Sequence, residues 1–183
     1  QKKTVWTNLH HLFKEGPMTQ PTRTAIFAGS FDPPTFGHLN IIERALKIFD
    51  HLIVAVASDI SKSSLLTVAE RLEILSEIIP SDPRIQIDSF RGLLVDYAKK
   101  KGVHILVRGI RTVADYEYEL QMSLANRMLN PNVETVFIMT EGRYSHISSS
   151  IIKQVISLGG SGKEMVPSCG EARLKEILLK SPL

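Results

Sequence analysis

The stretch TAIFAGSFDPPTFGHLN, residues 24–40, decides how the chain begins to fold. An apolar run typical of a buried strand ends at Gly29, and a helical stripe begins near His38. Glycine permits a turn there that other residues resist. Gly37 would let an anion approach the first helical turn, whose N–H groups carry partial positive charge. Taken alone, the stretch favours a tight turn with a surface histidine, because its glycines do not form the dinucleotide pattern G-x-G-x-x-G.

Short apolar runs alternate with helical patterns from residue 24 onward. HLIVAVA at 51–57 is rich in β-branched residues, whereas HLNIIERALKIF at 38–49 carries a helical stripe. Five such alternations predict an α/β fold, a doubly wound five-stranded parallel sheet with helices on both faces. We expect strands at 24–28, 51–57, 84–90, 104–109 and 135–139, and helices at 38–49, 67–80, 92–102, 113–129, 148–160 and 171–180.

The loops after the strands carry groups that bind phosphate. Ligands of parallel sheets bind beyond the carboxyl ends of the strands. Lys62 follows the second strand, Arg108 and Arg111 follow the fourth, and three serines at 148–150 follow the fifth. Each has a plain alternative as a surface charge or a helix-capping serine. Their coincidence predicts a phosphate-binding cleft formed by four of the loops at 28–38, 58–66, 88–94, 108–112 and 140–148.

The composition is that of an ordinary globular protein. The chain has 183 residues, of which 43% are hydrophobic and 22% charged, and its formal net charge is +3. This mild basic excess suits anionic small molecules, and there is no basic stripe that would indicate nucleic-acid binding. The single cysteine, Cys169, excludes an internal disulfide and a cysteine-based metal cluster. No apolar run reaches the roughly 18 residues of a membrane span, and no secretory signal is recognisable, so we expect a cytoplasmic protein.

Residues 1–23 differ from the rest. The segment has weak periodicity, ends in Gly, Pro and Thr, and contains Met18. We interpret it as an added or disordered leader with Met18 as the natural start. Residues 24–183 are expected to form one domain that includes the C-terminal helix.

Two motifs together resemble the nucleotidyltransferase superfamily. The first is (T/H)-x-G-H, here Thr35 to His38, and the second is I-S-S-x, here within YSHISSS at 144–150. More narrowly, the chain resembles bacterial phosphopantetheine adenylyltransferases from about Thr24 to Gly160. The features that carry this resemblance are FDPPTFGH at 31–38, SK at 61–62, T-x-x-ER at 67–71, RGIRTVADYEYE at 108–119, NRMLNP at 126–131 and HISSSIIK at 146–153.

The resemblance implies an activity and its partners. Members of that family use ATP and 4′-phosphopantetheine to form dephospho-coenzyme A and pyrophosphate in coenzyme A biosynthesis. Magnesium is expected with the ATP phosphates, with no dedicated metal-binding side chains. Family members are usually hexamers that coenzyme A can inhibit, so we expect a homohexamer with coenzyme A as a feedback inhibitor. No nucleic acid or membrane is expected as a partner.

The resemblance also implies roles for single positions. His38 matches the histidine that stabilises the transition state, and Lys62 matches the lysine that binds phosphates of both substrates. Arg111 completes the catalytic set. Tyr144 stands where many members have tryptophan, and Ser30 where many have threonine. The implied ATP-binding residues are Ser30, Phe31, Gly37, His38, Gly109, Ile110, Arg111, Glu119, Tyr144, Ser145, His146, Ile147, Ser148, Ser149 and Ser150, and the implied acceptor-binding residues are Ser30, Lys62, Leu94 and Arg108.

The expected reaction is a direct in-line displacement. The acceptor phosphate is already anionic, so the chemistry needs positioning and charge neutralisation rather than a general base. His38 would therefore act as a hydrogen-bond donor. Two alternatives remain open from the sequence: another enzyme of the superfamily, such as a nicotinate-mononucleotide adenylyltransferase or a cytidylyltransferase, and a non-catalytic nucleotide-sensing module on the same fold.

Overall fold

The computed structural model describes the backbone of residues 22–58 and 64–180, and side chains up to residue 177. Five parallel strands form one sheet in the order β3-β2-β1-β4-β5. The strand order reverses between β1 and β4, which places a topological switch point beside the middle strand. The predicted doubly wound parallel sheet is confirmed. The strands are β1 (Thr24–Gly29), β2 (His51–Ala57), β3 (Ile85–Phe90), β4 (Ile105–Ile110) and β5 (Glu134–Met139).

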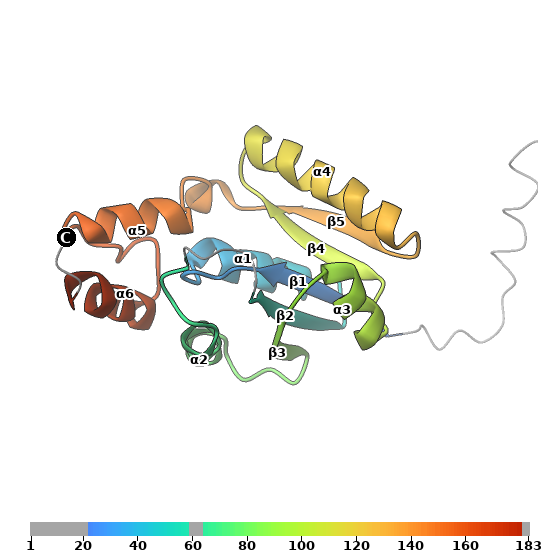
Figure 1. The fold of residues 1–183 in the computed structure, drawn as a ribbon, viewed down its shortest axis with the longest axis horizontal. Coiled ribbons are helices and arrows are strands. Elements are labelled where there is room, and N and C mark those ends of the chain that lie inside the picture. Colours follow the sequence, from blue (N-terminus) through green and yellow to red (C-terminus); the bar gives the residue numbers. More distant parts are fainter. Residues whose placement is uncertain (1–21, 59–63, 181–183) are drawn as a thin grey trace, which may run out of the picture.

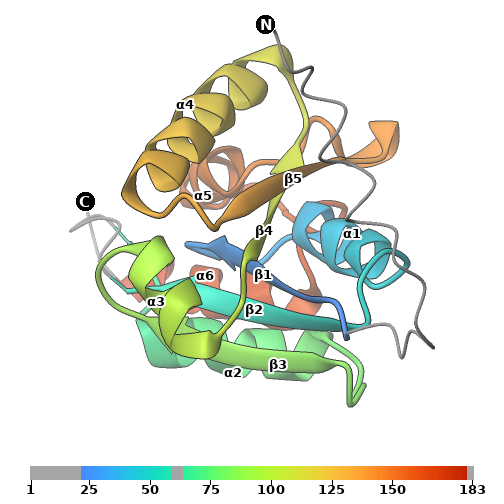
Figure 2. The same ribbon diagram turned by 90° about the vertical axis from the view of Figure 1, so that its right-hand side faces the viewer.

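Helices cover both faces of the sheet (Figure 1). Alternate residues of β1 separate two cores, because successive side chains of a strand point to opposite faces. Phe27 packs with α1 and α2, whereas Ile26 packs with α3. Figure 2 shows α4 on the outer side of β4 and β5, next to α3. The helices are α1 (Phe36–Ala45), α2 (Val68–Ile78), α3 (Leu94–Lys101), α4 (Val113–Leu129), α5 (Ser149–Ser157) and α6 (Ser168–Lys180), with a short 3-10 helix, η2, at Gly142–Tyr144.

A third core joins the last two helices to the rest. Ile152 and Ile156 of α5 and Leu174 of α6 are buried against Ile74 of α2. This cluster lies beyond the carboxyl ends of the strands, at the left of Figure 1. It therefore holds α5 beside the edge of the sheet where ligands are expected. In the part of the chain that the structure describes, no helix is long and apolar enough to cross a membrane.

Most expected bounds lie within two residues of the observed ones. The exceptions are the end of α1, at Ala45 rather than 49, the end of α5, at Ser157 rather than 160, and the start of α6, at Ser168 rather than 171. Helix α1 also starts differently, in an informative way. Its first residue is Phe36 rather than His38, because Thr35 caps the helix and His38 occupies the third helical position. A capping box formed by Thr67 and Glu70 begins α2. The expected leader falls almost wholly outside the described residues. Arg23, its last residue, is bound to Asp50 through both its side chain and its backbone N–H.

Candidate active site

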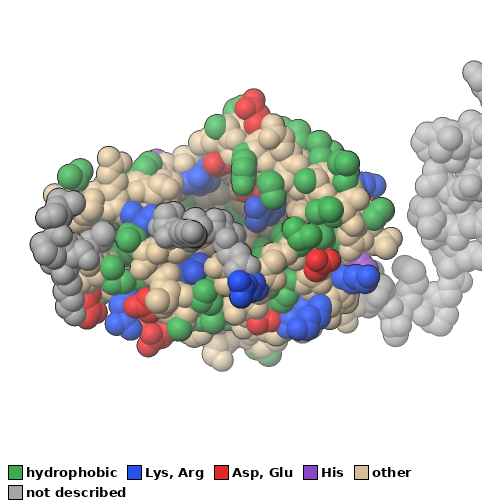
Figure 3. All heavy atoms as spheres, viewed as in Figure 1, with side chains coloured by type: hydrophobic (Ala, Val, Ile, Leu, Met, Phe, Trp, Pro, Cys, Tyr) green, Lys and Arg blue, Asp and Glu red, His purple; other side chains and the backbone are tan. Residues whose placement is uncertain are grey.

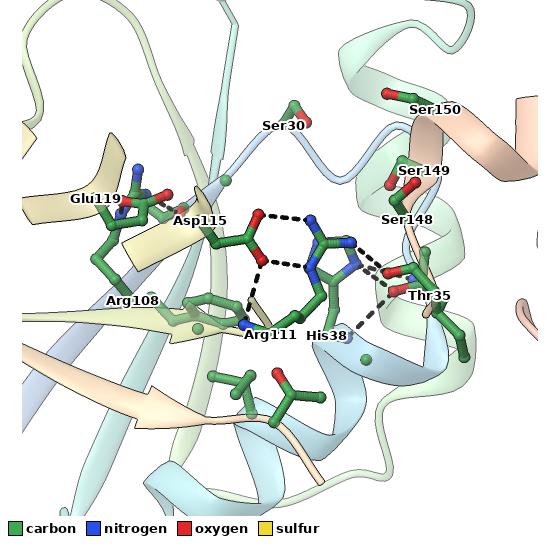
Figure 4. Close-up of a pocket in the computed structure, with 18 of the residues that line it drawn as sticks. Ser30, Thr35, His38, Arg108, Arg111, Asp115, Glu119, Ser148, Ser149 and Ser150 are labelled. Atoms are coloured by element: carbon green, nitrogen blue, oxygen red, sulfur yellow. Dashed lines mark hydrogen bonds and ion pairs between the residues drawn. The ribbon is translucent and has the colours of Figure 1, made fainter. Parts of the chain in front are cut away.

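A cavity of about 360 Å³ opens at the switch point between β1 and β4. It lies where α1 and α5 begin, and Figure 4 shows side chains from β1, β4 and the starts of α1, α4 and α5 pointing into it. The position agrees with the rule for parallel sheets. Its lining is formed by Phe27, Ala28, Gly29, Ser30, Thr35, Gly37, His38, Ile41, Arg108, Gly109, Arg111, Asp115, Tyr118, Glu119, Thr140, Ile147, Ser148, Ser149 and Ser150.

The ring of His38 is fixed by the residue that caps its own helix. Its Nδ1 atom lies 3.0 Å from the backbone nitrogen of Thr35 and 2.9 Å from Thr35 Oγ1. Because a backbone N–H can only donate, Nδ1 must be the acceptor. The proton of the neutral ring is therefore on Nε2. His38 therefore presents its Nε2–H donor to the cavity, and Thr35, the cap of α1, holds the ring in that orientation.

The surroundings keep this ring uncharged. Burial, and to a lesser degree the positive charge of Arg111, lower the pKa of His38 from 6.5 to about 4. The ring also packs at 4.9 Å, centroid to centroid, against Phe31. Phe31 is fully buried and has a φ of 49°, and its side chain packs in the core against the ring of His38. At neutral pH, His38 is a neutral donor with one orientation.

Two helix N-termini bring backbone N–H groups to the same cavity. In the first turn of α1, Phe36 N–H donates to the Met165 carbonyl and His38 N–H to Thr35 Oγ1, which leaves Gly37 N–H for a ligand. The amides of Ser149 and Ser150 begin α5 and likewise have no carbonyl one turn earlier in their helix. Paired helix N-termini favour an anion through these donors and the helix dipoles.

The serines at 148–150 do not act alike. Ser148 Oγ accepts the Ile151 N–H at 3.1 Å as the cap of α5, so its hydroxyl hydrogen can still donate into the cavity. Ser149 Oγ donates to the Pro33 carbonyl at 3.0 Å, so this hydroxyl ties α5 to the β1–α1 turn. Ser150 is exposed at the cavity edge. We therefore separate a donor role for Ser148 from an anchoring role for Ser149.

Arg111 joins α4 to the loop before α5. Its guanidinium binds both carboxylate oxygens of Asp115, at 2.9 and 3.0 Å. It also donates to the backbone carbonyl of Ile147. These bonds do not exhaust the N–H donors of a guanidinium. Arg111 is thus held rigidly at the cavity wall with donors remaining, as Figure 4 shows for its pair with Asp115.

Arg108 is fixed in a similar way. Its Nε donates to Glu119 Oε2 at 2.5 Å, and its Nη1 donates to the Ala28 carbonyl at 2.6 Å. The arginine therefore links β4, α4 and the end of β1. Between the two arginines, Gly109 lets α1 approach β4, because a Cβ there would lie only 2.9 Å from Ile41 Cγ1. Gly109 thus has a packing role as well as a place in the cavity lining.

Comparison with known proteins identifies the family. A family model of cytidylyltransferase-like proteins matches residues 26–155. A phosphopantetheine adenylyltransferase of Caldanaerobacter subterraneus subsp. tengcongensis is 46% identical over 159 residues, which is 87% of this chain and 99% of that protein. The chain belongs to the phosphopantetheine adenylyltransferase family. Another member, from Desulfatibacillum aliphaticivorans, is 51% identical over 83% of this chain and 87% of its own length.

A solved structure supports the fold alone. A crystal structure from Vibrio parahaemolyticus, assigned as a nicotinate-nucleotide adenylyltransferase, superimposes with a TM-score of 0.60 and 19% identity. It covers 89% of this chain and 98% of the other. Such a likeness shows that the two chains share a Rossmann-like fold, which the phosphopantetheine adenylyltransferase family uses here.

Not every position implied by the family resemblance lies at the cavity. Tyr144 packs beside the third core with Arg143 4.7 Å from its ring centroid, and Leu94 packs at the edge of the second core. Lys62 lies outside the described residues. The implied positions that do not line the cavity are Phe31, Leu94, Ile110, Tyr144, Ser145 and His146. Those that do are Ser30, Gly37, His38, Arg108, Gly109, Arg111, Glu119, Ile147, Ser148, Ser149 and Ser150.

Sequence reasoning missed several cavity residues of this phosphopantetheine adenylyltransferase. Asp115 follows Arg111 by four residues, the spacing of a helical ion pair, and this signal could have identified it. Thr35 and His38 were both named in the first motif, but the bond between them was not predicted, although their spacing is that of a capping box. Thr140 directly follows β5, within the loop at 140–148 that was predicted to bind ligands, but it was not singled out. Ile41 and Tyr118 carry no local signal, since only the packing of α1 and α4 brings them to the cavity.

Proposed function

We propose that this chain transfers the adenylyl group of ATP to 4′-phosphopantetheine, giving dephospho-coenzyme A and pyrophosphate. Membership of the phosphopantetheine adenylyltransferase family supports the assignment. The observation that carries it within the structure is the orientation of His38. Its Nδ1 is occupied by Thr35, and its protonated Nε2 is left for a phosphoryl oxygen between two helix N-termini.

The proposed step is one in-line displacement. A phosphate oxygen of the acceptor forms a bond to the α-phosphorus of ATP while the bond from that phosphorus to the bridging oxygen breaks. The electron pair leaves with pyrophosphate, so no covalent enzyme intermediate forms. Negative charge grows on the α-phosphoryl oxygens, and His38 Nε2–H and Gly37 N–H are the donors beside them. No base is required, because the acceptor phosphate is ionised near neutral pH.

The triphosphate is proposed to lie along the start of α5. The amides of Ser149 and Ser150, the Ser148 hydroxyl and the remaining donors of Arg111 would hold the β- and γ-phosphates. Arg108 lies on the side of the cavity opposite these serines (Figure 4), and it would bind the acceptor phosphate together with Ser30, which also lines the cavity. Lys62 is proposed to reach both substrates, from a segment outside the described residues.

Magnesium is proposed to enter with ATP. The cavity carboxylates, Asp115 and Glu119, are paired with Arg111 and Arg108. Among the described residues, no group of three His, Cys, Asp or Glu side chains could hold a metal ion. This donor set fits an ion held by phosphate oxygens and water, which is a common way for Mg²⁺ to bind. Its contribution would be to neutralise charge on the leaving pyrophosphate.

Assembly into a homohexamer is proposed on the surface of α4. None of the 17 residues of this helix is buried, although it carries several large apolar side chains. Figure 3 shows hydrophobic side chains gathered over this part of the molecule, at the upper right. Exposed apolar surface of this kind is typical of an interface, here with a second copy of the chain. The exposed apolar residues are Val113, Tyr116, Tyr118, Met122, Leu124, Met128 and Leu129.

Two further predictions accompany this function. Coenzyme A shares its adenylyl and pantetheine parts with the product, so we expect it to inhibit by occupying the same cavity. A cytoplasmic location also stays a prediction.

The deciding experiment measures pyrophosphate release from ATP and Mg²⁺ with each acceptor. We expect rapid release with 4′-phosphopantetheine and only background release without acceptor or with nicotinate mononucleotide. Preference for nicotinate mononucleotide would instead support another enzyme of the superfamily. Tight ATP binding without release for any acceptor would support a nucleotide-sensing module.

A further inference from the structure

A buried carboxylate lies behind the cavity rather than in it. Asp32, in the β1–α1 turn, is 3% exposed and is absent from the cavity lining. Its two oxygens accept the backbone N–H groups of Leu65 and Leu66, at 3.0 and 2.9 Å. The ammonium of Lys153 lies 2.9 Å from Oδ2. One side chain therefore joins the β1–α1 turn, the segment before α2, and α5.

The link to α5 uses one face of that helix. Ser149 and Lys153 are four residues apart and so lie on the same face. Ser149 Oγ binds the Pro33 carbonyl, and Lys153 binds Asp32, the residue immediately before Pro33. Asp32 and Pro33, which are adjacent in the β1–α1 segment, thus bind residues one helical turn apart in α5. This arrangement fixes both the position and the direction of α5 relative to the turn that leads into α1.

The same contacts make the pair hard to replace. Loss of the Lys153 ammonium would leave the buried Asp32 carboxylate with two backbone N–H donors and, as its remaining opposite charge, the nearby Arg71 guanidinium. Removing one member of a buried ion pair is destabilising because the other charge loses its direct partner. The first turn of α5 carries the amides of Ser149 and Ser150, so a shift of this helix would move donors that face the cavity.

We propose that Asp32 and Lys153 are positioning residues for ATP: their ion pair sets the N-terminus of α5 against the N-terminus of α1. The inference rests on the proposed adenylyl transfer, and it assigns to these residues no contact with a substrate. A misplacement of about 1 Å can cost on the order of 100-fold in rate, so a modest shift of α5 has a measurable effect.

The primary test substitutes Lys153→Met in the full-length protein and compares it with Lys163→Met, an exposed lysine outside α5. We expect kcat/KM for ATP to fall about 10- to 100-fold in Lys153→Met, through a raised KM for ATP. The KM for 4′-phosphopantetheine should change less than about twofold. ATP binding measured by calorimetry without acceptor should weaken in parallel. Lys153→Arg keeps the charge and should restore most of the ATP affinity.

A double-mutant cycle separates positioning from general stability. If the pair acts as a unit, Lys153→Met should add little to the loss of ATP affinity already caused by Asp32→Asn. A purely structural role predicts lower thermal stability or kcat with an unchanged KM for ATP, and that result would overturn the proposal, as would additive effects. Failure of the proposed function is distinguishable, because wild-type protein would then release no pyrophosphate with 4′-phosphopantetheine.

Discussion

The backbone N–H groups of Thr35 and His38 each donate to the side chain of the other residue. Thr35 N–H donates to His38 Nδ1 at 3.0 Å, and His38 N–H donates to Thr35 Oγ1 at 3.3 Å. The pair therefore caps α1 and selects the ring tautomer at the same time. A catalytic donor that is also part of a helix cap has its orientation fixed before any substrate arrives.

Replacing the histidine by asparagine should separate these two roles. In His38→Asn, the amide oxygen can accept the Thr35 N–H in place of Nδ1, but no donor remains at the position of Nε2. We expect turnover to fall about 100- to 1000-fold, with a loss of stability no larger than the roughly 1 kcal/mol of a typical substitution. Steady-state pyrophosphate release and urea unfolding measure the two quantities, with ATP binding as the check on the site. Turnover near that of the wild type would exclude His38 as the donor.

The stability of the wild type should depend on pH through the same ring. Its folded-state pKa is lowered to about 4, whereas the ordinary value is 6.5. The unfolded chain therefore binds a proton between these values that the folded chain does not, and stability is lost as pH falls from 6.5 to 4. Urea unfolding at pH 7 and 4.5 should show a smaller acid loss in His38→Asn than in the wild type. Equal losses would mean that the folded ring titrates normally.

Substitution by alanine should affect ATP affinity at Gly37 and stability at Gly109. A Cβ at Gly37 would have ordinary contacts, 3.4 Å from Thr35 Oγ1, so Gly37→Ala should fold normally. Its methyl group would stand beside the amide that we assign to phosphate, and ATP affinity should fall about tenfold, the equivalent of one neutral hydrogen bond. At Gly109 the Cβ would meet Ile41 at 2.9 Å, so Gly109→Ala should lose about 1–3 kcal/mol of stability. Thermal unfolding and ATP titration of both variants, run together, test the contrast.

The proposed assembly should depend on the apolar face of α4. Leu124 and Met128 are 56% and 86% exposed, and a charge at either position has ample space in a single chain. We expect Leu124→Glu with Met128→Glu to convert the oligomer to smaller species while thermal unfolding remains cooperative. Sedimentation velocity measures the change, and Lys100→Glu, on exposed α3 surface, is the control. An unchanged sedimentation coefficient would place any interface elsewhere.

The sequence predicted the sheet well because the central strands β1 and β2 are buried on both faces. Apolar runs such as Leu52 to Ala57 are fully interior and hard to mistake for loops once helices flank them. The helix at Val113–Leu129 was expected with the bounds observed, since Thr112 caps its start and Pro131 follows its end. The start of α1 was misplaced by two residues because a histidine is an unusual partner in a capping box.

The sequence predicted which loops form the site, but not which of their side chains contact one another. The rule for parallel sheets brought the regions of His38, Arg111 and Ser148 together. It could not show that Phe31 turns inward, which depends on its positive φ and on the space beside Gly29. Nor could it pair Asp32 with Lys153, because 121 residues separate them and no local pattern records such a contact.

Movement of helix α4 would change the active site, because this helix holds both of its arginines. Asp115 and Glu119, on its inner side, hold Arg111 and Arg108, while its apolar outer side is the face that we propose to pack against a second copy of the chain. A small apolar compound that entered this interface and tilted the helix would displace both guanidiniums without entering the cavity. Inhibitors of this kind would not compete with ATP, and their target surface is chemically unrelated to a nucleotide pocket.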